Sequence, residues 1–484
     1  MVDLARKVLK NSFFISLRAL ISGAGGLAFS IALARFLSPE SFGIYALALS
    51  VCFFILQFDP TGYTMIRYIS YALGKNDLPA ARGYFRFLLK IRLAFGLSAS
   101  ILVFVLAKPI AFTVFHKPEI FIPLQILSAF VFFYYFSDFL ESCFTAFQNF
   151  KYVAMRNSIY ESLKFILAVP FAFLGLFYGI FFGIVAATII TFIIMLSFLL
   201  RKYQVVIKGE YKKVEERRVL RFMSSISIST ISGVLFGYVD MIMLGMFLPA
   251  EYAGYYKVAT SIVFGIGGLI AISNVLFPVF TQLEGGSMEG AFKKVFKYSS
   301  ILSFPFAASL AFFSTQIIKI VYGVEYLPAA LPLIILSPVI IFGSLDFFGV
   351  LLGAKDKPEY AAVVTLISMI LNVILNYALI LSIGMIGAAI ATMASRLFSI
   401  IANGILSRKV LNISPELSSI YKPSIATFIM VGFFYLIPKP ETLGFGILEL
   451  IVAFLVYFVV LFLIKGIGRE DLRYAMAIAG IEKI

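Results

Sequence analysis

Charged side chains interrupt segments of this chain that are otherwise apolar. Arg18 lies eight residues after Lys10 and Arg396 lies twelve residues before Arg408, which places them about 12 Å and about 18 Å along their helices. A cation near the middle of a membrane span costs about 2.5 to 3.5 kcal/mol on insertion scales, so it requires a carboxylate or water. We expect both arginines to line a polar cavity; the alternative is a structural ion pair between helices.

Other cations are weaker candidates for the same cavity. Lys164 follows Glu161 by three residues, so a local pair is favoured there. Arg67 and Arg92 lie close enough to the expected inner surface for their side chains to reach it, and we expect this of Arg92 above all. Lys257 is the corresponding residue near the outer end of its span. The candidate substrate-binding cations are Arg18, Arg396, Arg67, Lys164 and Lys257.

Carboxylates within or near the ends of apolar segments form a second set. Asp138 and Glu141 are three residues apart and share one face of a helix. Carboxylates in such positions often couple transport to protons or Na⁺, although helix capping or pairing with arginine explains any one of them equally well. The candidates for gating or ion coupling are Asp59, Pro60, Gly62, Asp138, Glu141, Asp240 and Asp346.

The stretch QFDPTGYTMIRYIS, residues 57–70, is unusual for a membrane span. Asp59 follows a long apolar run, Pro60 removes a backbone donor and Gly62 weakens the helix, so we expect a kink there. In a transporter, a carboxylate at this bend would be an element of a gate or a cavity. The alternative is a static kink in which Asp59 pairs with a neighbouring helix.

The residue types that build metal and catalytic sites are scarce. Cys52 and Cys143 are the two cysteines, both within apolar runs, and His116 is the single histidine. A His/Cys metal site is therefore close to excluded, and we expect both thiols to be packed. We expect no catalytic residues, no enzyme activity and no cofactor beyond a coupling ion, H⁺ or Na⁺.

Composition indicates a membrane protein. The 484 residues are 61% hydrophobic and 13% charged, and apolar spans recur along the whole chain. The net charge of +15 arises because most of the 40 Lys and Arg residues lie at alternate ends of the spans, the positive-inside pattern. This accounts for the charge without nucleic acid. It predicts a multi-pass protein of the plasma membrane, in contact with lipids, with a retained first helix and both termini in the cytoplasm.

Apolar runs and their charged breaks predict an all-α polytopic fold with about fourteen transmembrane helices. The expected spans are residues 11–35, 42–72, 86–107, 119–147, 156–176, 179–200, 222–247, 253–282, 294–318, 328–352, 360–382, 386–406, 421–437 and 443–464.

The sequence also repeats. IALARFLSPESFGIYALALSV (31–51) aligns without a gap on IMLGMFLPAEYAGYYKVATSI (242–262) at an offset of 211 residues, and Gly43 matches Gly254. Because six spans separate equivalent points, the copies have one orientation and a pseudo-twofold axis along the membrane normal. The repeat predicts two parallel six-helix lobes joined by a polar linker. This linker is either an amphipathic helix on the membrane surface or a plain connection. The predicted divisions are an N-terminal lobe (1–200), a cytoplasmic linker (201–221), a C-terminal lobe (222–408) and two extra helices with a cytoplasmic tail (409–484).

This arrangement, together with ARFLSPESFGIYALALS, IRYISYALGKND and NVILNYALILSIGMIGAAIATMAS, resembles the oligosaccharide flippase branch of the multidrug/oligosaccharidyl-lipid/polysaccharide exporter superfamily. The resemblance covers essentially the full chain. It implies a transporter that moves a polyprenyl-linked oligosaccharide from the inner to the outer leaflet by alternating access, and a monomer is sufficient because both lobes are on one chain. A cationic cavity would receive the phosphate of such a substrate.

Two other functions compete with this one. An ion-coupled multidrug or metabolite antiporter of the same superfamily would need an ion site and a smaller, more apolar pocket. A membrane-embedded glycosyltransferase or polymerase would need a sizeable outer portion carrying acid and base groups, and the outer loops expected here are short. The buried cations favour the anionic lipid substrate.

Overall fold

The computed structural model describes residues 2–270, 285–355, 357–437, 442–468 and 471. Within these residues the chain consists of helices and short connections, without a β-strand. The predicted all-α fold is confirmed. The end of the expected span 253–282 and nearly all of the predicted cytoplasmic tail after residue 468 lie outside the described residues.

The helices of the N-terminal half follow the expected spans and begin where the sequence supplies caps. Ser38 accepts a hydrogen bond from Ser41 N at 3.3 Å, and Asp77 accepts one from Ala80 N at 3.1 Å, each at the start of a helix. The helices are α1 (Val2–Phe36), α2 (Pro39–Leu56), α3 (Thr61–Gly74), α4 (Leu78–Pro109), α5 (Phe121–Ala146), α6 (Phe150–Phe173), α7 (Phe177–Lys202) and α8 (Gln204–Ile207).

The C-terminal half is also helical. Its helices are α9 (Glu216–Phe247), α10 (Ala250–Ile270), α12 (Gly285–Phe312), α13 (Ser314–Ile317), α14 (Ala330–Leu336), α15 (Pro338–Leu345), α16 (Phe348–Ala354), α17 (Pro358–Ile383), α18 (Met385–Leu411), α19 (Ser418–Phe434) and α20 (Leu443–Leu463).

Within the described ranges, nine helices are long and apolar enough to cross a bilayer, and one pair bent by 42° around Ser337 would make a tenth. The remaining expected spans also coincide with helices, such as α6 and α9. The helix α6 is not among the nine because it carries Arg156, Glu161 and Lys164 within its length. The chain is a multi-pass membrane protein.

Contacts divide the chain into two compact units. Unit 1 comprises residues 1–269 and 365–395, and unit 2 comprises residues 270–364 and 396–484. The lobe boundaries inferred from the repeat stay a prediction.

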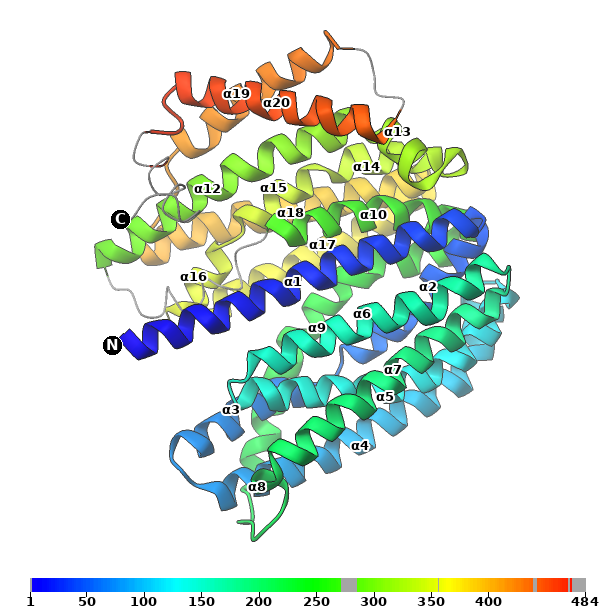
Figure 1. Ribbon diagram of the computed structural model, residues 1–484, viewed down its shortest axis with the longest axis vertical. Coiled ribbons are helices and arrows are strands. Elements are labelled where there is room, and N and C mark those ends of the chain that lie inside the picture. Colours follow the sequence, from blue (N-terminus) through cyan, green and yellow to red (C-terminus); the bar gives the residue numbers. More distant parts are fainter. Residues whose placement is uncertain (1, 271–284, 356, 438–441, 469–470, 472–484) are drawn as a thin grey trace. The chain divides into compact units, whose positions relative to one another are not determined.

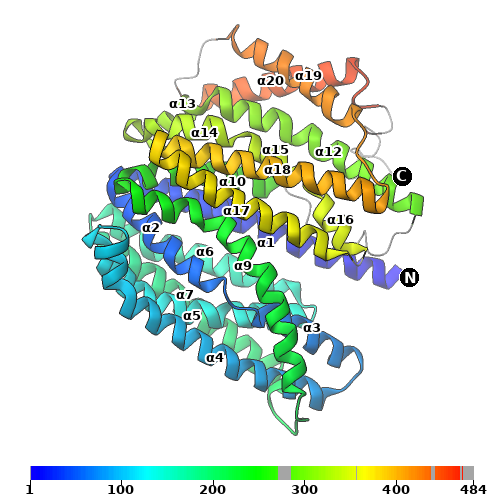
Figure 2. The same ribbon diagram turned by 180° about the vertical axis from the view of Figure 1, so that it is seen from behind.

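In unit 1 the long helices lie side by side. Helix α6 packs between α1 and α7, while α5 packs against both α7 and α4 (Figure 1). The opposite view shows α2 and α9, which also contact each other (Figure 2). Near the α3 end of these helices, Met65, Leu88, Phe139 and Phe144 form a buried apolar cluster. Tight packing of this kind holds helices together in lipid, where apolar burial alone gives no preference for a neighbouring helix.

Two glycines that correspond in the repeat make a symmetric contact. A Cβ atom on Gly43 of α2 would lie 1.8 Å from the carbonyl oxygen of Ala250, and one on Gly254 of α10 would lie 2.2 Å from that of Pro39. Pro39 and Ala250 are themselves equivalent at the offset of 211 residues. The reciprocal contact is what a twofold axis produces where it passes between two copies of one motif.

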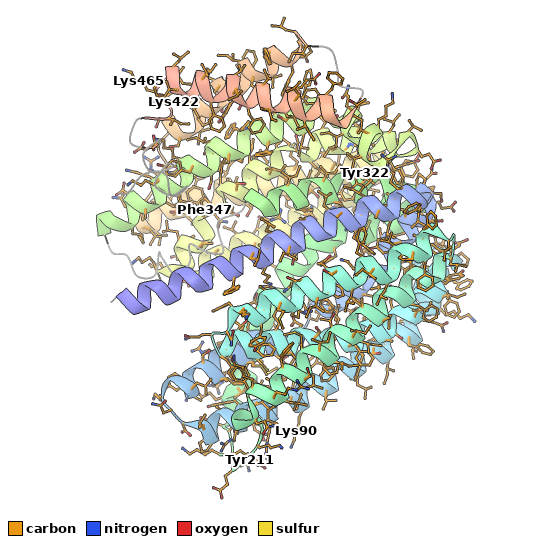
Figure 3. All side chains as sticks on the ribbon, viewed as in Figure 1. Lys90, Tyr211, Tyr322, Phe347, Lys422 and Lys465 are labelled. Carbon is orange, nitrogen blue, oxygen red and sulfur yellow. The ribbon has the colours of Figure 1, made fainter. Side chains whose placement is uncertain are left out.

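Of the two alternatives for the linker, the plain connection is present and the amphipathic helix is not. Only the four residues of α8 are helical before α9 begins at Glu216. The segment instead lies against the start of α4: Arg82 donates to Glu210 O at 2.9 Å, and Lys212 N donates to Pro79 O at 2.9 Å. Gly83 permits this close approach, since a Cβ there would lie 2.1 Å from Lys212 O. Figure 3 shows Lys90 and Tyr211 at this same end of the unit.

In unit 2, α12 packs against α14, α15 and α19, and α19 packs against α20. A buried cluster containing Ile301, Met430 and Phe434 joins α12 to α19. At one end of the α19–α20 pair, Lys422 Nζ donates to Lys465 O at 2.8 Å, and both residues are labelled in Figure 3.

Candidate functional site

The break between α2 and α3 carries a buried carboxylate. Helix α2 ends at Leu56 and α3 begins at Thr61, so the predicted kink is confirmed as an interruption of the helix. Asp59 accepts hydrogen bonds from Thr61 N at 2.9 Å and from Thr61 Oγ1 at 2.8 Å, and its side chain is 1% exposed. Pro60 lacks the N–H needed to continue α2, and Asp59 satisfies the first donor of α3 instead.

Arg92 of α4 balances this carboxylate. It forms an ion pair with Asp59, a second ion pair with Asp138 of α5 at 3.0 Å, and a hydrogen bond to Tyr135 O at 2.8 Å. Arg92 is only 2% exposed. The expectation that it reaches the inner surface is therefore wrong: the helix break places two acidic partners beside it, and pairing there replaces solvation by water. Of the two alternatives for Asp59, the pair with a neighbouring helix is present.

A polar cavity lies within unit 1. Its volume is about 480 Å³, and its lining includes four cationic side chains: Arg18, Arg156, Lys164 and Lys257. The acidic side chains in its lining are Asp138 and Glu161. A second cavity of about 440 Å³ shares Arg18 and Asp138 with the first and extends to Asp59, Gly62 and Glu141. The first cavity takes residues from both sides of the linker, since Lys257 belongs to α10.

Glu141 of α5 is held by two arginines in this region. Its Oε1 lies 2.5 Å from Arg18 Nη2, and its Oε2 lies 3.0 Å from Arg156 Nη1 of α6. Asn157 Nδ2 donates to the same Oε2 at 3.3 Å. The Glu141 side chain is 7% exposed, whereas that of Arg18 is 44% exposed. The structure thus gives Arg18 both of the features considered for it, a cavity position and an ion pair.

The two lysines of the cavity differ in their partners. Lys164 Nζ lies 2.6 Å from Glu161 Oε2, which confirms the expected local pair. Lys257 has no acidic side chain of the described residues within ion-pair distance, and it is close enough to Lys164 for their like charges to repel. An anion between these two lysines would relieve that repulsion.

Asp240 of α9 occupies a different environment. Tyr256 OH donates to it at 2.8 Å, Asn376 Nδ2 donates at 2.6 Å, and Thr392 Oγ1 also donates. These partners come from α10, α17 and α18, and Asp240 is 8% exposed. Within the described residues no Lys or Arg forms an ion pair with it, so its ionised form is surrounded by neutral donors alone.

The remaining candidates lie elsewhere. Arg67 is exposed on α3, over the Phe222 ring at 4.3 Å, and does not line either cavity. Pro60 is buried at the helix break. In unit 2, Asp346 follows α15, accepts from Asn403 Nδ2 at 3.4 Å and interacts electrostatically with Arg396 of α18. The structure therefore gives Asp346 and Arg396 a shared location within unit 2, and neither lines the two cavities described above.

Sequence reasoning missed several residues of the site. Arg156 and Asn157 begin the expected span 156–176 and are not among the candidate residues, because a cation at the end of a span ordinarily lies at the membrane surface. The shell around Asp240 was also missed, although Asn372 and Asn376 are four residues apart in an apolar segment and therefore share a helix face. That spacing was the available signal. Cys52 and Cys143 are buried free thiols, as expected.

Solved structures share this fold. The lipid II flippase MurJ in an inward closed conformation superposes with a TM-score of 0.77 at 17% identity, covering 93% of this chain and 97% of that one. An inward-facing multidrug resistance MATE family transporter of the MOP superfamily superposes with a TM-score of 0.67 at 15% identity, covering 84% and 98% of the two chains. At these identities the likeness shows the fold alone, which this chain shares with both proteins.

Sequence comparison gives the family. Residues 32–331 match the family described as "Polysaccharide biosynthesis protein", and the chain belongs to that family. The probable low-salt glycan biosynthesis flippase Agl15 of Haloferax volcanii is 31% identical over 42% of this chain and 45% of its own length. The uncharacterized membrane protein MJ1068 of Methanocaldococcus jannaschii is 27% identical over 81% of this chain and 82% of its own. The match with Agl15 thus spans less than half of the length of that flippase.

Proposed function

We propose that this protein flips a polyprenyl-linked oligosaccharide from the inner to the outer leaflet of the plasma membrane, by alternating access and as a monomer, with both termini in the cytoplasm. The observation that carries the proposal is the cavity with four cationic side chains, Arg18, Arg156, Lys164 and Lys257, inside a membrane-embedded unit. Cations are costly in a membrane and are retained where they serve a substrate or an ion. The family and the flippase name of one relative support the same substrate class.

The chemistry of the cavity suits both parts of such a substrate. Arg18 and the two lysines of the cavity, Lys164 and Lys257, offer charge and hydrogen-bond donors to a phosphate or pyrophosphate. Tyr45 and Tyr238 in the lining offer ring faces and hydroxyl groups to a sugar. The volume of about 480 Å³ lies within the range of ordinary ligand pockets and suits a phosphate with one or two sugars.

The test is leaflet translocation of a fluorescent polyprenyl-phosphate sugar in proteoliposomes. We expect Arg18→Gln and Lys257→Met each to lower the rate at least tenfold, because each removes a charge-assisted contact to the phosphate. Arg67→Gln is the matched control: it removes a cation from the same unit but outside both cavities, and should leave the rate nearly unchanged. Failure of the wild-type protein to translocate any of several lipid-linked glycans would overturn the proposal.

Asp240 is the proposed site of ion coupling. A buried carboxylate with neutral donors alone is stabilised by a bound proton or Na⁺, and Asn376 Oδ1, which has no hydrogen-bond partner within the described residues, supplies a further oxygen near it. We expect an imposed Na⁺ or pH gradient to accelerate wild-type transport and to have little effect on Asp240→Asn. Asp346→Asn, which removes a carboxylate that has Arg396 beside it, should keep the gradient response. Equal responses of both variants and the wild type would exclude Asp240.

The same observation favours a second candidate, an ion-coupled multidrug or metabolite antiporter. Such a protein would use Asp240 in the same way but would carry a different cargo. Gradient-driven export of a cationic dye, without translocation of lipid-linked sugar, would select this alternative.

A further inference from the structure

Glu141 makes contacts that a substrate phosphate would be expected to make. Each of its two oxygens meets a different arginine, Arg18 at 2.5 Å and Arg156 at 3.0 Å. A phosphate group offers arginines the same pattern of charged oxygen acceptors. The carboxylate therefore satisfies the two guanidinium groups of the cationic cavity.

The two arginines are not held equally. Arg156 also donates from Nε to Ser137 Oγ at 3.1 Å and lies over the Tyr134 ring at 5.0 Å, so several contacts fix it. Arg18 lies on α1, whereas Arg156 lies on α6. The Arg18 side chain is 44% exposed, and the Arg156 side chain is 4% exposed. Arg18 lines both cavities of unit 1. Of the two partners, Arg18 is the one that an incoming anion can reach.

We propose that Glu141 is an internal stand-in for the phosphate of the substrate: it holds Arg18 in the unloaded cavity, and the substrate phosphate takes Arg18 from it. This inference rests on the proposed function and specifies how that site is controlled. Loss of Arg18 does not leave Glu141 as an isolated buried charge, because Arg156 and Asn157 Nδ2 still hold its Oε2. The exchange therefore avoids the large penalty of an unpaired charge away from water.

The exchange has a consequence for turnover. A transporter must bind its substrate tightly enough to load and weakly enough to release it. Competition from Glu141 weakens phosphate binding, and the recapture of Arg18 by Glu141 assists release. Removal of the carboxylate should therefore tighten binding and slow transport at the same time.

The experiment compares Glu141→Gln with Glu161→Gln in the purified full-length protein. Glu161 is a matched control because it is a carboxylate of the same cavity, paired with Lys164 rather than with an arginine. The probe is farnesyl pyrophosphate, with binding measured by calorimetry in detergent. We expect Glu141→Gln to bind about tenfold more tightly than the wild type, the effect of one charge-assisted hydrogen bond no longer contested. Glu161→Gln should change the affinity less.

Translocation in proteoliposomes supplies a second measurement. Glu141→Gln should lower both KM and kcat for a fluorescent polyprenyl-phosphate sugar, whereas a merely structural loss would lower kcat with weaker binding. In the double variant Arg18→Gln/Glu141→Gln the gain in affinity should disappear. Glu141→Asp keeps the charge but shortens the reach to Arg18; it should bind with intermediate affinity, and it keeps the test usable if Glu141→Gln does not fold.

The outcomes separate the two proposals. If the wild type binds the probe and translocates the lipid-linked sugar, but both Glu141 variants bind no more tightly than it does, the stand-in role is wrong and the flippase proposal stands. If the wild type neither binds the probe nor translocates, the proposed function fails and this inference fails with it.

Discussion

Arg92 shows how one residue holds the helix break together. Its guanidinium joins Asp59 at the break to Asp138 of α5 and to Tyr135 O, while remaining 2% exposed. Removal of one partner from a buried ion pair leaves the other charge uncompensated, which costs more than the pair contributes.

We expect Arg92→Gln to lower the free energy of unfolding by about 3 to 5 kcal/mol. The measurement is thermal unfolding of the purified protein in detergent. Arg67→Gln is the control, because Arg67 is an exposed arginine of α3 that lines neither of the two cavities. An unfolding temperature of Arg92→Gln equal to that of the wild type would show that the network contributes nothing to stability.

At the scale of elements, the crossing of α2 and α10 depends on the absence of two side chains. A Cβ atom on Gly43 or on Gly254 would meet a backbone carbonyl of the opposite helix at 1.8 or 2.2 Å. A backbone atom cannot turn aside as a flexible side chain can, so the helices themselves would have to separate.

We expect Gly43→Ala and Gly254→Ala each to destabilise the protein by about 1 to 3 kcal/mol, the range for overpacked interiors. Gly432→Ala in α19 is the control: a Cβ there meets nothing within 4 Å, so the better helix propensity of alanine should leave stability unchanged or raise it by up to about 1 kcal/mol. Denaturation in detergent measures all three variants. Full stability of either crossing variant would contradict the close contact.

The linker is held to the loop before α4 by an ion pair. Lys212 Nζ donates to Asp77 Oδ2 at 2.7 Å. This hydrogen bond and the one from Ala80 N hold the pKa of Asp77 below its ordinary value. Because the pKa is lower in the folded protein, the stabilisation is present above the ordinary aspartate pKa, about 3.9, and is lost as the pH falls through the lowered value.

We therefore expect the difference in unfolding temperature between the wild type and Asp77→Asn to be the same at pH 7.5 and at pH 5. Trypsin should also cleave the linker of Asp77→Asn faster at pH 7.5, because Lys208, Lys212 and Lys213 lose an anchor. Glu119→Gln, which removes a carboxylate outside this contact, is the control. A difference that changes markedly between pH 7.5 and pH 5 would contradict the lowered pKa, because Asp77 would then have to titrate within this range in the folded protein.

At the scale of the whole molecule, the distribution of Lys and Arg predicts the orientation. His116 lies in a connection expected outside, and Lys212 lies in the linker expected in the cytoplasm. Both native cysteines are buried, so a cysteine introduced at either position would be the reactive one.

We expect a membrane-impermeant maleimide to label His116→Cys in intact cells and Lys212→Cys only after the cells are opened. The unmodified protein, with Cys52 and Cys143 alone, provides the background. Labelling of Lys212→Cys in intact cells would reverse the predicted topology.

The sequence alone determined the class of the molecule. Long apolar runs in a bilayer must satisfy their backbone hydrogen bonds within themselves, so they form helices wherever they pack. Interactions between residues close in sequence can likewise be predicted from the sequence. For this reason Pro60 predicted the helix break, and the spacing of Glu161 and Lys164 predicted their ion pair. The repeat revealed equivalent positions such as Gly43 and Gly254, because similarity within the chain needs no knowledge of contacts.

Only the tertiary structure decided which charges meet. Arg92 was expected at the surface, yet the helix break places Asp59 and Asp138 beside it. Arg156 was not a candidate for the cavity, yet it shares Glu141 with Arg18. The three hydrogen-bond donors around Asp240 of α9 come from three other helices, α10, α17 and α18. Such contacts depend on how helices distant in sequence are rotated and packed, and the order of residues along one helix does not encode the partner on another.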